Sequence, residues 1–305
     1  MKIGYGKTHG KIILMGEHAV VYNYPCIALP FFDASVTTTV TEDTTQRLTC
    51  DFYDGLFETM PELMSGLKKV VLCVLEALHH EHTNLHITIE STIPIERGMG
   101  SSAAVAGSVV KALFNYFEVP LSHEQLLHFI GISETITHGK PSGIDALTTT
   151  STEAVYFIRN QAPQPIVIDM DASLIVADTG EMGKTREAVA SIQQKLDQPE
   201  VQHHLHSIGQ CTTQARQAME NHQPIVLGQL MNEVHHHLDA LGVSSASLNQ
   251  LVNLANHNGA LGSKLTGGGR GGCMIALCKP EDEQRIVQAL QQQATHVWSM
   301  SLKGE

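Results

Sequence analysis

Apolar and β-branched residues occur along the chain in short runs that alternate with longer helical patterns. Short runs of this kind, bounded by Gly, Pro or polar turns, predict strands. Strands are expected at Lys11–Met15, Ser35–Thr41, Leu85–Glu90, Ala154–Ile158, Leu174–Ala177 and Met274–Cys278. The longer segments, several of them preceded by Ser, Thr or Pro, predict helices. Helices are expected at Glu62–His80, Ser102–Phe117, His123–His138, Thr185–Leu196, Ile225–Leu241, Ala246–Asn258 and Glu281–Leu290.

The order of these elements predicts the fold class and the domain organisation. Because strands and helices alternate instead of segregating, the chain is expected to be α+β or mixed, with two lobes. A length of 305 residues suits two domains of ordinary size. The Gln- and Pro-containing stretch 160–165 is the most linker-like segment, so the boundary is expected near it. The predicted domains are 1–163 and 164–305.

Composition and charge narrow the class of protein. The net charge of -12, from 31 acidic and 19 basic residues, offers no basic surface for a polyanion, so nucleic acid is excluded as an expected partner. The six cysteines form no C-x-x-C pair, which argues against a zinc ribbon or a disulfide framework and favours a reducing cytoplasm. No uninterrupted apolar stretch approaches the roughly 20 residues that span a bilayer. We therefore expect neither secretion nor a membrane partner.

A glycine-rich segment directly after an expected strand carries the first candidate chemistry. Its two glycines allow a tight turn close to an anion, and the two serines that follow open a helix with free amide donors. The segment predicts a phosphate cradle for a nucleotide triphosphate, with a tightly packed strand-to-helix turn as the alternative. It does not fit the Walker pattern, because no Lys follows the second glycine. The candidate ATP-binding residues are Pro94, Arg97, Gly98, Met99, Gly100, Ser101, Ser102 and Ala103.

Two further segments, Gly10–Tyr22 and Lys264–Cys273, accompany this loop. In their order along the chain the three resemble the signature motifs of the GHMP kinases, the family named for galactokinase, homoserine kinase, mevalonate kinase and phosphomevalonate kinase. The run Gly16–Tyr22 is most similar to the mevalonate-phosphorylating members. The resemblance implies a ribosomal-protein-S5-like N-terminal lobe, a ferredoxin-like C-terminal lobe, a homodimer, and ATP-dependent phosphorylation of mevalonate. Phosphomevalonate or another small alcohol as acceptor, and a non-catalytic ATP and metabolite sensor, are the alternatives.

The resemblance also implies roles for single residues. Asp145 matches the carboxylate that accepts or orients the proton of the acceptor hydroxyl, and Lys11 matches the lysine beside it. Glu134 and Ser102 match the residues that hold Mg²⁺. The implied acceptor-binding residues are Glu17, His18 and Thr266, of which the last could contact a phosphate instead.

Each of these residues, taken alone, also has a plainer interpretation. Glu134 could be a solvated charge on a helix, and Asp145 could cap a turn formed by residues 141–143. Lys11 could be an edge-strand lysine that discourages strand pairing, and His18 could be structural. Glu96 stands beside the expected cradle where many family members carry Gly, so either Arg97 balances its charge or it faces solvent.

The 18 histidines include three clusters, around residues 79–82, 203–206 and 235–237. A metal site on a helix needs histidines three or four residues apart, as His79 with His82 or His203 with His206 would be. Solvated helix faces are the favoured interpretation of these clusters.

Overall fold

The computed structural model describes residues 2–138 and 141–304. Contacts between Cα atoms divide the chain into two compact units that interleave along the sequence. Unit 1 comprises residues 1–11, 30–94 and 100–152, and unit 2 comprises residues 12–29, 95–99 and 153–305. Two short N-terminal segments, 12–29 and 95–99, thus belong with the C-terminal part of the chain. The domain boundary at 163/164 stays a prediction.

Unit 1 is built on strands in the order β4-β3-β5-β2, with β1 also paired to β2. Strands β2 and β5 are antiparallel, from Val36 opposite Ser91 to Glu42 opposite Leu85, whereas β3 and β5 are parallel. Alternate residues of β2 between Val36 and Val40 are buried, which gives this part of the sheet one face toward the core. The strands are β1 (Ile3–Met15), β2 (Cys26–Glu42), β3 (Arg47–Cys50), β4 (Tyr53–Leu56) and β5 (Leu85–Ser91).

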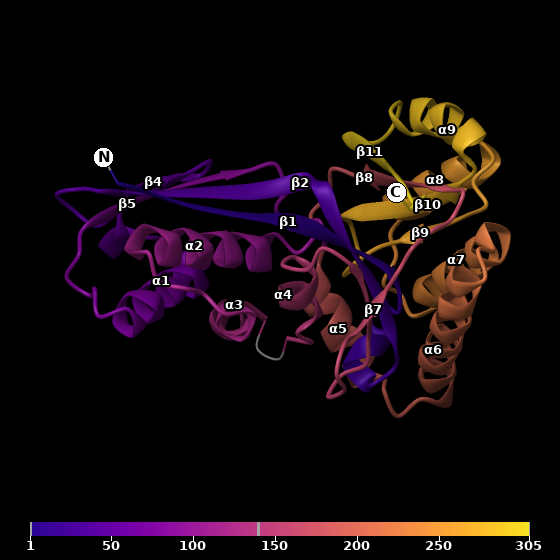
Figure 1. Ribbon diagram of the computed structural model, residues 1–305. Coiled ribbons are helices and arrows are strands. Elements are labelled where there is room, and N and C mark those ends of the chain that lie inside the picture. The colour runs from indigo at the N-terminus through magenta and orange to yellow at the C-terminus, as the bar shows by residue number, and fades with distance from the viewer. Residues whose placement is uncertain (1, 139–140, 305) are drawn as a thin grey trace. The chain divides into compact units, whose positions relative to one another are not determined.

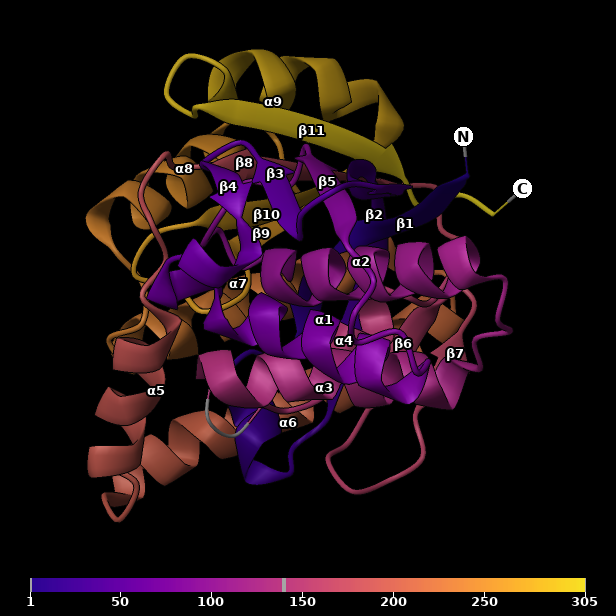
Figure 2. The same cartoon turned by 90° about the vertical axis from the view of Figure 1, so that its left-hand side faces the viewer.

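Helices α1, α2 and α3 pack on one another and cover one face of the strands of unit 1 (Figures 1 and 2). Helix α2 lies directly against β1, because a Cβ atom at Gly6 would come within 2.0 Å of the Ser108 carbonyl oxygen. This close packing fixes the position of α2 and hence of its N-terminus. The helical elements are η2 (Phe57–Thr59), η3 (Glu62–Met64), α1 (Ser65–Ala77), α2 (Ser101–Phe117), α3 (His123–His138) and α4 (Ile144–Thr148).

Unit 2 contains an antiparallel sheet in the order β11-β8-β10-β9, in which Cys273 lies opposite Asp178 and Met274 opposite Leu265. The start of β2 pairs with β6, which pairs with β7. Helices α7 and α8 pack on β9, α9 packs on β8 and β11, and α6 lies beside α7 (Figure 1). The strands are β6 (Ala154–Phe157), β7 (Gln164–Ile166), β8 (Ser173–Asp178), β9 (Gly262–Leu265), β10 (Cys273–Cys278) and β11 (His296–Ser301).

The helices of unit 2 include one that the periodicity of the sequence did not predict. This is α6, a 22-residue helix rich in His and Gln, with Pro199 at its first turn. Within the part of the chain that the structure describes, no helix combines the length and the apolar character that a bilayer crossing requires. The helical elements are η1 (Ala19–Tyr22), α5 (Thr185–Gln194), α6 (Pro199–Glu220), α7 (Pro224–Ala240), α8 (Ala246–His257), η4 (Pro280–Asp282) and α9 (Glu283–Leu290).

Candidate active site

Lys11 and Asp145 form an ion pair in unit 1, with Nζ 3.0 Å from Oδ1. Lys11 lies on β1 and is 3% exposed, whereas the carboxylate of Asp145 is 29% exposed. Asp145 is the second residue of α4, which begins after Gly143 with φ 87, a left-handed conformation that favours glycine. Burial of the ammonium rules out the interpretation of Lys11 as an exposed edge-strand lysine.

Glu134 projects from α3 into the same part of unit 1. It is 4% exposed, so it is not a solvated helix charge. Burial, followed by the nearby charge of Asp145, raises the pKa of Glu134 to about 8, while Lys11 and a hydrogen bond with Ser102 oppose this rise. Two carboxylates therefore lie near one ammonium. Because a second negative charge is disfavoured in this poorly solvated place, Glu134 retains its proton at neutral pH.

Helix α2 begins at Ser101, and Gly100 before it has φ 73. A Cβ atom at Gly100 would lie 2.9 Å from Cγ of Lys11, so only glycine lets the backbone pass this closely over the lysine. Gly100 occupies the N-cap position and has no side chain to cap this end of α2. Its first amide groups are therefore available to an anion close to Lys11.

The first part of the predicted cradle, residues 95–99, belongs to unit 2. The guanidinium of Arg97 pairs with Asp178 at 2.9 Å and donates to the Gly180 carbonyl oxygen at 2.8 Å. Glu96 is exposed and Arg97 turns to Asp178, so the question left open by the sequence is answered: Glu96 faces solvent. A direct contact of Arg97 with ATP stays a prediction, and in this structure Arg97 anchors the loop.

Two glycine-rich segments touch in unit 2. Gly98 has φ 77, and a Cβ atom there would lie 3.2 Å from the Cα atom of Gly267. A Cβ atom at Gly272 would lie 2.9 Å from the Arg97 carbonyl oxygen. The segment 267–272 is therefore a support against which the loop 95–99 packs, and side chains at these positions would separate the two.

The predicted acceptor-binding residues Glu17, His18 and Thr266 are all buried in unit 2. The hydroxyl of Thr266 donates to the Ile13 carbonyl oxygen at 2.8 Å and accepts from the Ile13 amide at 3.1 Å. The His18 Nε2 atom lies 3.1 Å from the Gly268 carbonyl oxygen, and burial lowers the pKa of His18 to about 4. Contact of these three residues with an acceptor stays a prediction.

The partner of Glu17 was missed by the sequence analysis. Glu17 forms an ion pair with Lys264, and both side chains are fully buried. The only signal in the sequence was a lysine at the start of the segment 264–273, beside the small residues Gly262 and Ser263. Fully buried lysines are rare unless they are paired, but no pattern of spacing identifies the partner.

Metal binding, the alternative interpretation of the histidine clusters, gains no support from a site with three or more ligands. Among residues 2–138 and 141–304, no group of three or more His, Cys, Asp or Glu side chains is placed to hold a metal ion. Instead, Nδ1 of His204 on α6 lies 2.9 Å from Nδ1 of His237 on α7. These two histidines come from different clusters, and their contact links α6 to α7.

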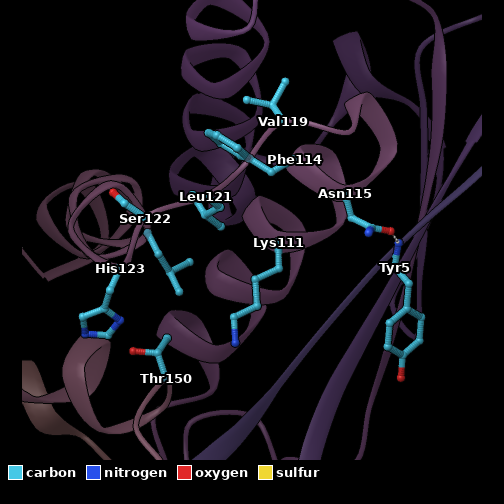
Figure 3. A pocket seen from close by; sticks show the side chains of 10 residues that line it. Tyr5, Lys111, Phe114, Asn115, Val119, Leu121, Ser122, His123 and Thr150 are labelled. Atoms are coloured by element: carbon cyan, nitrogen blue, oxygen red, sulfur yellow. Dashed lines mark hydrogen bonds between the residues drawn. The ribbon is translucent and has the colours of Figure 1, made fainter.

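Unit 1 also contains a hollow of about 470 Å³ that is separate from these residues (Figure 3). Lys111 reaches from α2 toward Thr150, and its Nζ atom donates to the Lys7 carbonyl oxygen at 3.1 Å. Burial lowers the pKa of Lys111. The hollow includes none of Lys11, Ser102, Glu134 and Asp145, so it is not the candidate active site. Its lining residues are Tyr5, Lys111, Phe114, Asn115, Val119, Leu121, Ser122, His123, Leu126 and Thr150.

Comparison with known proteins identifies the family. Residues 67–152 match the family described as GHMP kinases N terminal domain, and residues 215–296 match GHMP kinases C terminal. The mevalonate kinase of Pyrococcus abyssi is 33% identical over 304 residues, which cover 92% of this chain and 90% of the relative. The chain belongs to the mevalonate kinases of the GHMP kinase family. The predicted family and the ATP-dependent phosphotransferase activity are thereby confirmed.

Solved structures agree with this assignment. Mevalonate kinase from methicillin-resistant Staphylococcus aureus MRSA252 is 33% identical, matches the whole of both chains and has a TM-score of 0.78. The L. major mevalonate kinase in complex with R-mevalonate is 25% identical, covers 98% of this chain and 96% of that one, and has a TM-score of 0.82. The predicted two-lobe α+β fold of the GHMP kinases is confirmed.

Proposed function

We propose that the protein transfers the γ-phosphoryl group of ATP to the primary hydroxyl of (R)-mevalonate, giving 5-phosphomevalonate and ADP. A bond forms between the mevalonate oxygen and Pγ, and the bond from Pγ to the oxygen that bridges to the β-phosphate breaks. The observation that carries the proposal is the Lys11–Asp145 ion pair beside Glu134 and Ser102. It occurs in a chain that is 33% identical to a mevalonate kinase along its whole length.

Asp145 is the proposed acceptor of the proton that leaves the mevalonate hydroxyl. Its carboxylate is partly exposed, so a substrate hydroxyl can approach it, and its place in the first turn of α4 holds its direction. Lys11 is a buried cation on a rigid strand. It stabilises negative charge on the hydroxyl oxygen and on the transferred group, which is the main demand of a loose phosphoryl-transfer transition state.

Glu134 and Ser102 are the proposed protein ligands of Mg²⁺. The donor set fits the ion, because Mg²⁺ takes one or two protein oxygens and completes its coordination with phosphate oxygens and water. Burial and the charge of Asp145 disfavour a carboxylate at Glu134, and a divalent cation bound there would favour it. When bound, the ion neutralises charge on the β- and γ-phosphates.

The phosphates of ATP are proposed to bind the backbone of residues 98–103, where the start of α2 offers uncapped amide groups. His18 is proposed to contact mevalonate. A homodimer in the cytoplasm completes the proposal, and its support is the resemblance to the family. Sedimentation equilibrium of the purified protein tests the dimer.

The decisive experiment measures ADP release by the purified chain with Mg²⁺ and ATP. Mevalonate, phosphomevalonate, galactose and homoserine are compared as acceptors, and mass spectrometry identifies the product. We expect turnover with mevalonate alone and a 5-phosphate as the product. Turnover with another acceptor would assign the protein to a GHMP kinase of different substrate specificity. If none of the four acceptors leads to ADP release although ATP binds, the protein is a non-catalytic sensor of ATP and a metabolite.

A further inference from the structure

The end of β1 and the loop after it are tied to segment 264–268 by three polar contacts inside unit 2. Thr266 bonds twice to the backbone of Ile13. The Lys264 ammonium pairs with Glu17, and His18 Nε2 lies 3.1 Å from the Gly268 carbonyl oxygen. Because three residues of each segment take part in these contacts, the position of one segment sets that of the other.

Lys264 is the most unusual member of this set, because its side chain is 0% exposed. Its Nζ atom also donates to the Leu265 carbonyl oxygen at 2.7 Å, and burial lowers the pKa of Lys264 while Glu17 opposes this shift. A buried ion pair is rarely more stabilising than a pair of apolar side chains of the same volume. Stability alone therefore does not account for a lysine at this position.

His18 follows Glu17 directly and has a constrained geometry. Its φ of 59 is uncommon for a residue with a side chain, and the Glu17 carbonyl oxygen accepts from the Ala19 amide at 2.6 Å. Because Nε2 faces a carbonyl oxygen, this nitrogen carries the proton and Nδ1 is an acceptor. Within the described residues, Nδ1 is buried and has no hydrogen-bond partner. It therefore needs a donor, which a hydroxyl group supplies.

We propose that Lys264 is a positioning residue for the acceptor substrate: by fixing Glu17 it holds His18 in the orientation and tautomer that accept a hydrogen bond from a hydroxyl of mevalonate. This rests on the proposed function. Lys264 itself touches neither substrate nor reacting atoms. Its removal therefore affects the binding of the alcohol more than the binding of ATP.

The test compares Lys264→Met with the double variant Glu17→Met and Lys264→Met. The single variant leaves a buried carboxylate without its ammonium, and we expect a lower melting temperature. The double variant removes both charges at similar volume, and we expect the melting temperature to recover. The exposed Lys279, which pairs with Glu281, supplies the control Lys279→Met.

Kinetics then separate positioning from mere structural support. In Lys264→Met, which keeps Glu17, and in the recovered double variant we expect KM for mevalonate to rise about tenfold, which corresponds to the loss of one hydrogen bond, while KM for ATP changes less than about twofold. Wild-type KM for both substrates in a fully folded double variant would overturn the proposal. An equal rise in both KM values would also overturn it, because the loop that holds Glu17 and His18 would then support the binding of both substrates alike.

A second measurement does not depend on activity. Nitrogen-15 NMR of histidine-labelled protein, with the His18 signal assigned by its loss in His18→Asn, reports the tautomer. We expect one neutral tautomer with Nε2 protonated in the wild type and a mixture in the double variant. An unchanged spectrum in the double variant would refute positioning by Lys264. Failure of the wild type to phosphorylate mevalonate, with the NMR result as expected, would instead refute only the proposed substrate.

Discussion

The Nζ atom of Lys11 lies 3.0 Å from Oδ1 of Asp145, with the ammonium almost fully buried and the carboxylate partly exposed. This unequal burial assigns different tasks to the two groups. The cation is held rigidly inside unit 1, where its field is poorly screened, and the anion is the member that a substrate hydroxyl can reach. An ion pair that served only stability would gain nothing from leaving the carboxylate open.

Replacing Asp145 by Asn removes the proton acceptor and keeps the shape of the side chain. We expect kcat to fall by about 10² to 10⁴ while ATP binding, measured by calorimetry, changes little. Lys11→Met is expected to reduce kcat by a similar factor, because it removes the cation near the transferred group. Asp171→Asn, at an exposed aspartate, is the control. Near-normal turnover by Asp145→Asn would show that positioning alone suffices.

Glu134 predicts a specific dependence on pH. Its ordinary pKa of 4.5 is raised to about 8 in the folded chain, first by burial and then by Asp145. Between these two values the folded state binds more protons than the unfolded state, so the free energy of unfolding falls as pH rises from about 4.5 to about 8. Glu134→Gln should abolish this contribution. Urea titrations of both proteins across this range, without Mg²⁺ or ATP, measure it.

The same carboxylate should set the Mg²⁺ requirement. A ligand must be deprotonated to bind a metal, so the Mg²⁺ concentration for half-maximal activity should decrease as pH rises toward about 8. Glu134→Gln should raise that concentration at every pH and flatten its pH dependence. Unchanged metal dependence in this variant would remove Glu134 from the metal site.

The sequence predicted strongly apolar or amphipathic elements well and polar ones poorly. The six predicted strands all lie within or largely overlap observed strands, but β2 begins at Cys26 although Pro30 lies within it. Helix α6 was missed because its many His and Gln residues obscure the amphipathic pattern, although buried residues such as Leu205 and Ile208 recur at helical spacing. Short strands such as β9 contain too few residues for a periodic pattern to be recognised. Whether such a segment forms a strand depends on the strands with which it pairs.

The candidate site was predictable as a set of residues but not as contacts. Resemblance named Lys11, Ser102, Glu134 and Asp145, and the structure brings these four together in unit 1. The anchoring role of Arg97 depends on Asp178, at the end of β8, and no local pattern connects the two. Pairings between distant segments come from tertiary packing, which a single sequence does not encode in its spacing.

The pair of Arg97 and Asp178 predicts how the phosphate loop is held. Asp178→Asn leaves the guanidinium largely buried without its anion, so we expect the free energy of unfolding to fall by about 3 kcal/mol. The loop 95–99 should loosen, and KM for ATP should rise more than KM for mevalonate. The exposed pair of Arg47 and Asp54 offers the control Asp54→Asn, for which we expect little change. Equal effects of both variants would contradict an anchoring role.

The contact between His204 and His237 predicts a loss of stability in acid. The pKa of His237 is lowered from its ordinary value of 6.5, first by burial and then by His204, with smaller effects of His236 and His203 and an opposing one of Glu233. Below pH 6.5 the unfolded chain therefore binds more protons at this position than the folded chain, and stability falls as pH decreases. The effect of His204 on the pKa of His237 fits the geometry, since the Nδ1 atoms of the two rings lie 2.9 Å apart.

The variant His237→Gln should therefore lose less stability than the wild type between pH 7 and pH 5. Urea midpoints at the two pH values measure this difference, and activity at pH 7 should be unaffected because the pair lies on α6 and α7, outside the proposed catalytic residues. His82→Gln, at an exposed histidine, is the matched control and should follow the wild type. If both variants lose stability in parallel with the wild type, the packing of α6 against α7 does not depend on the charge of this pair, and other groups must account for any acid sensitivity.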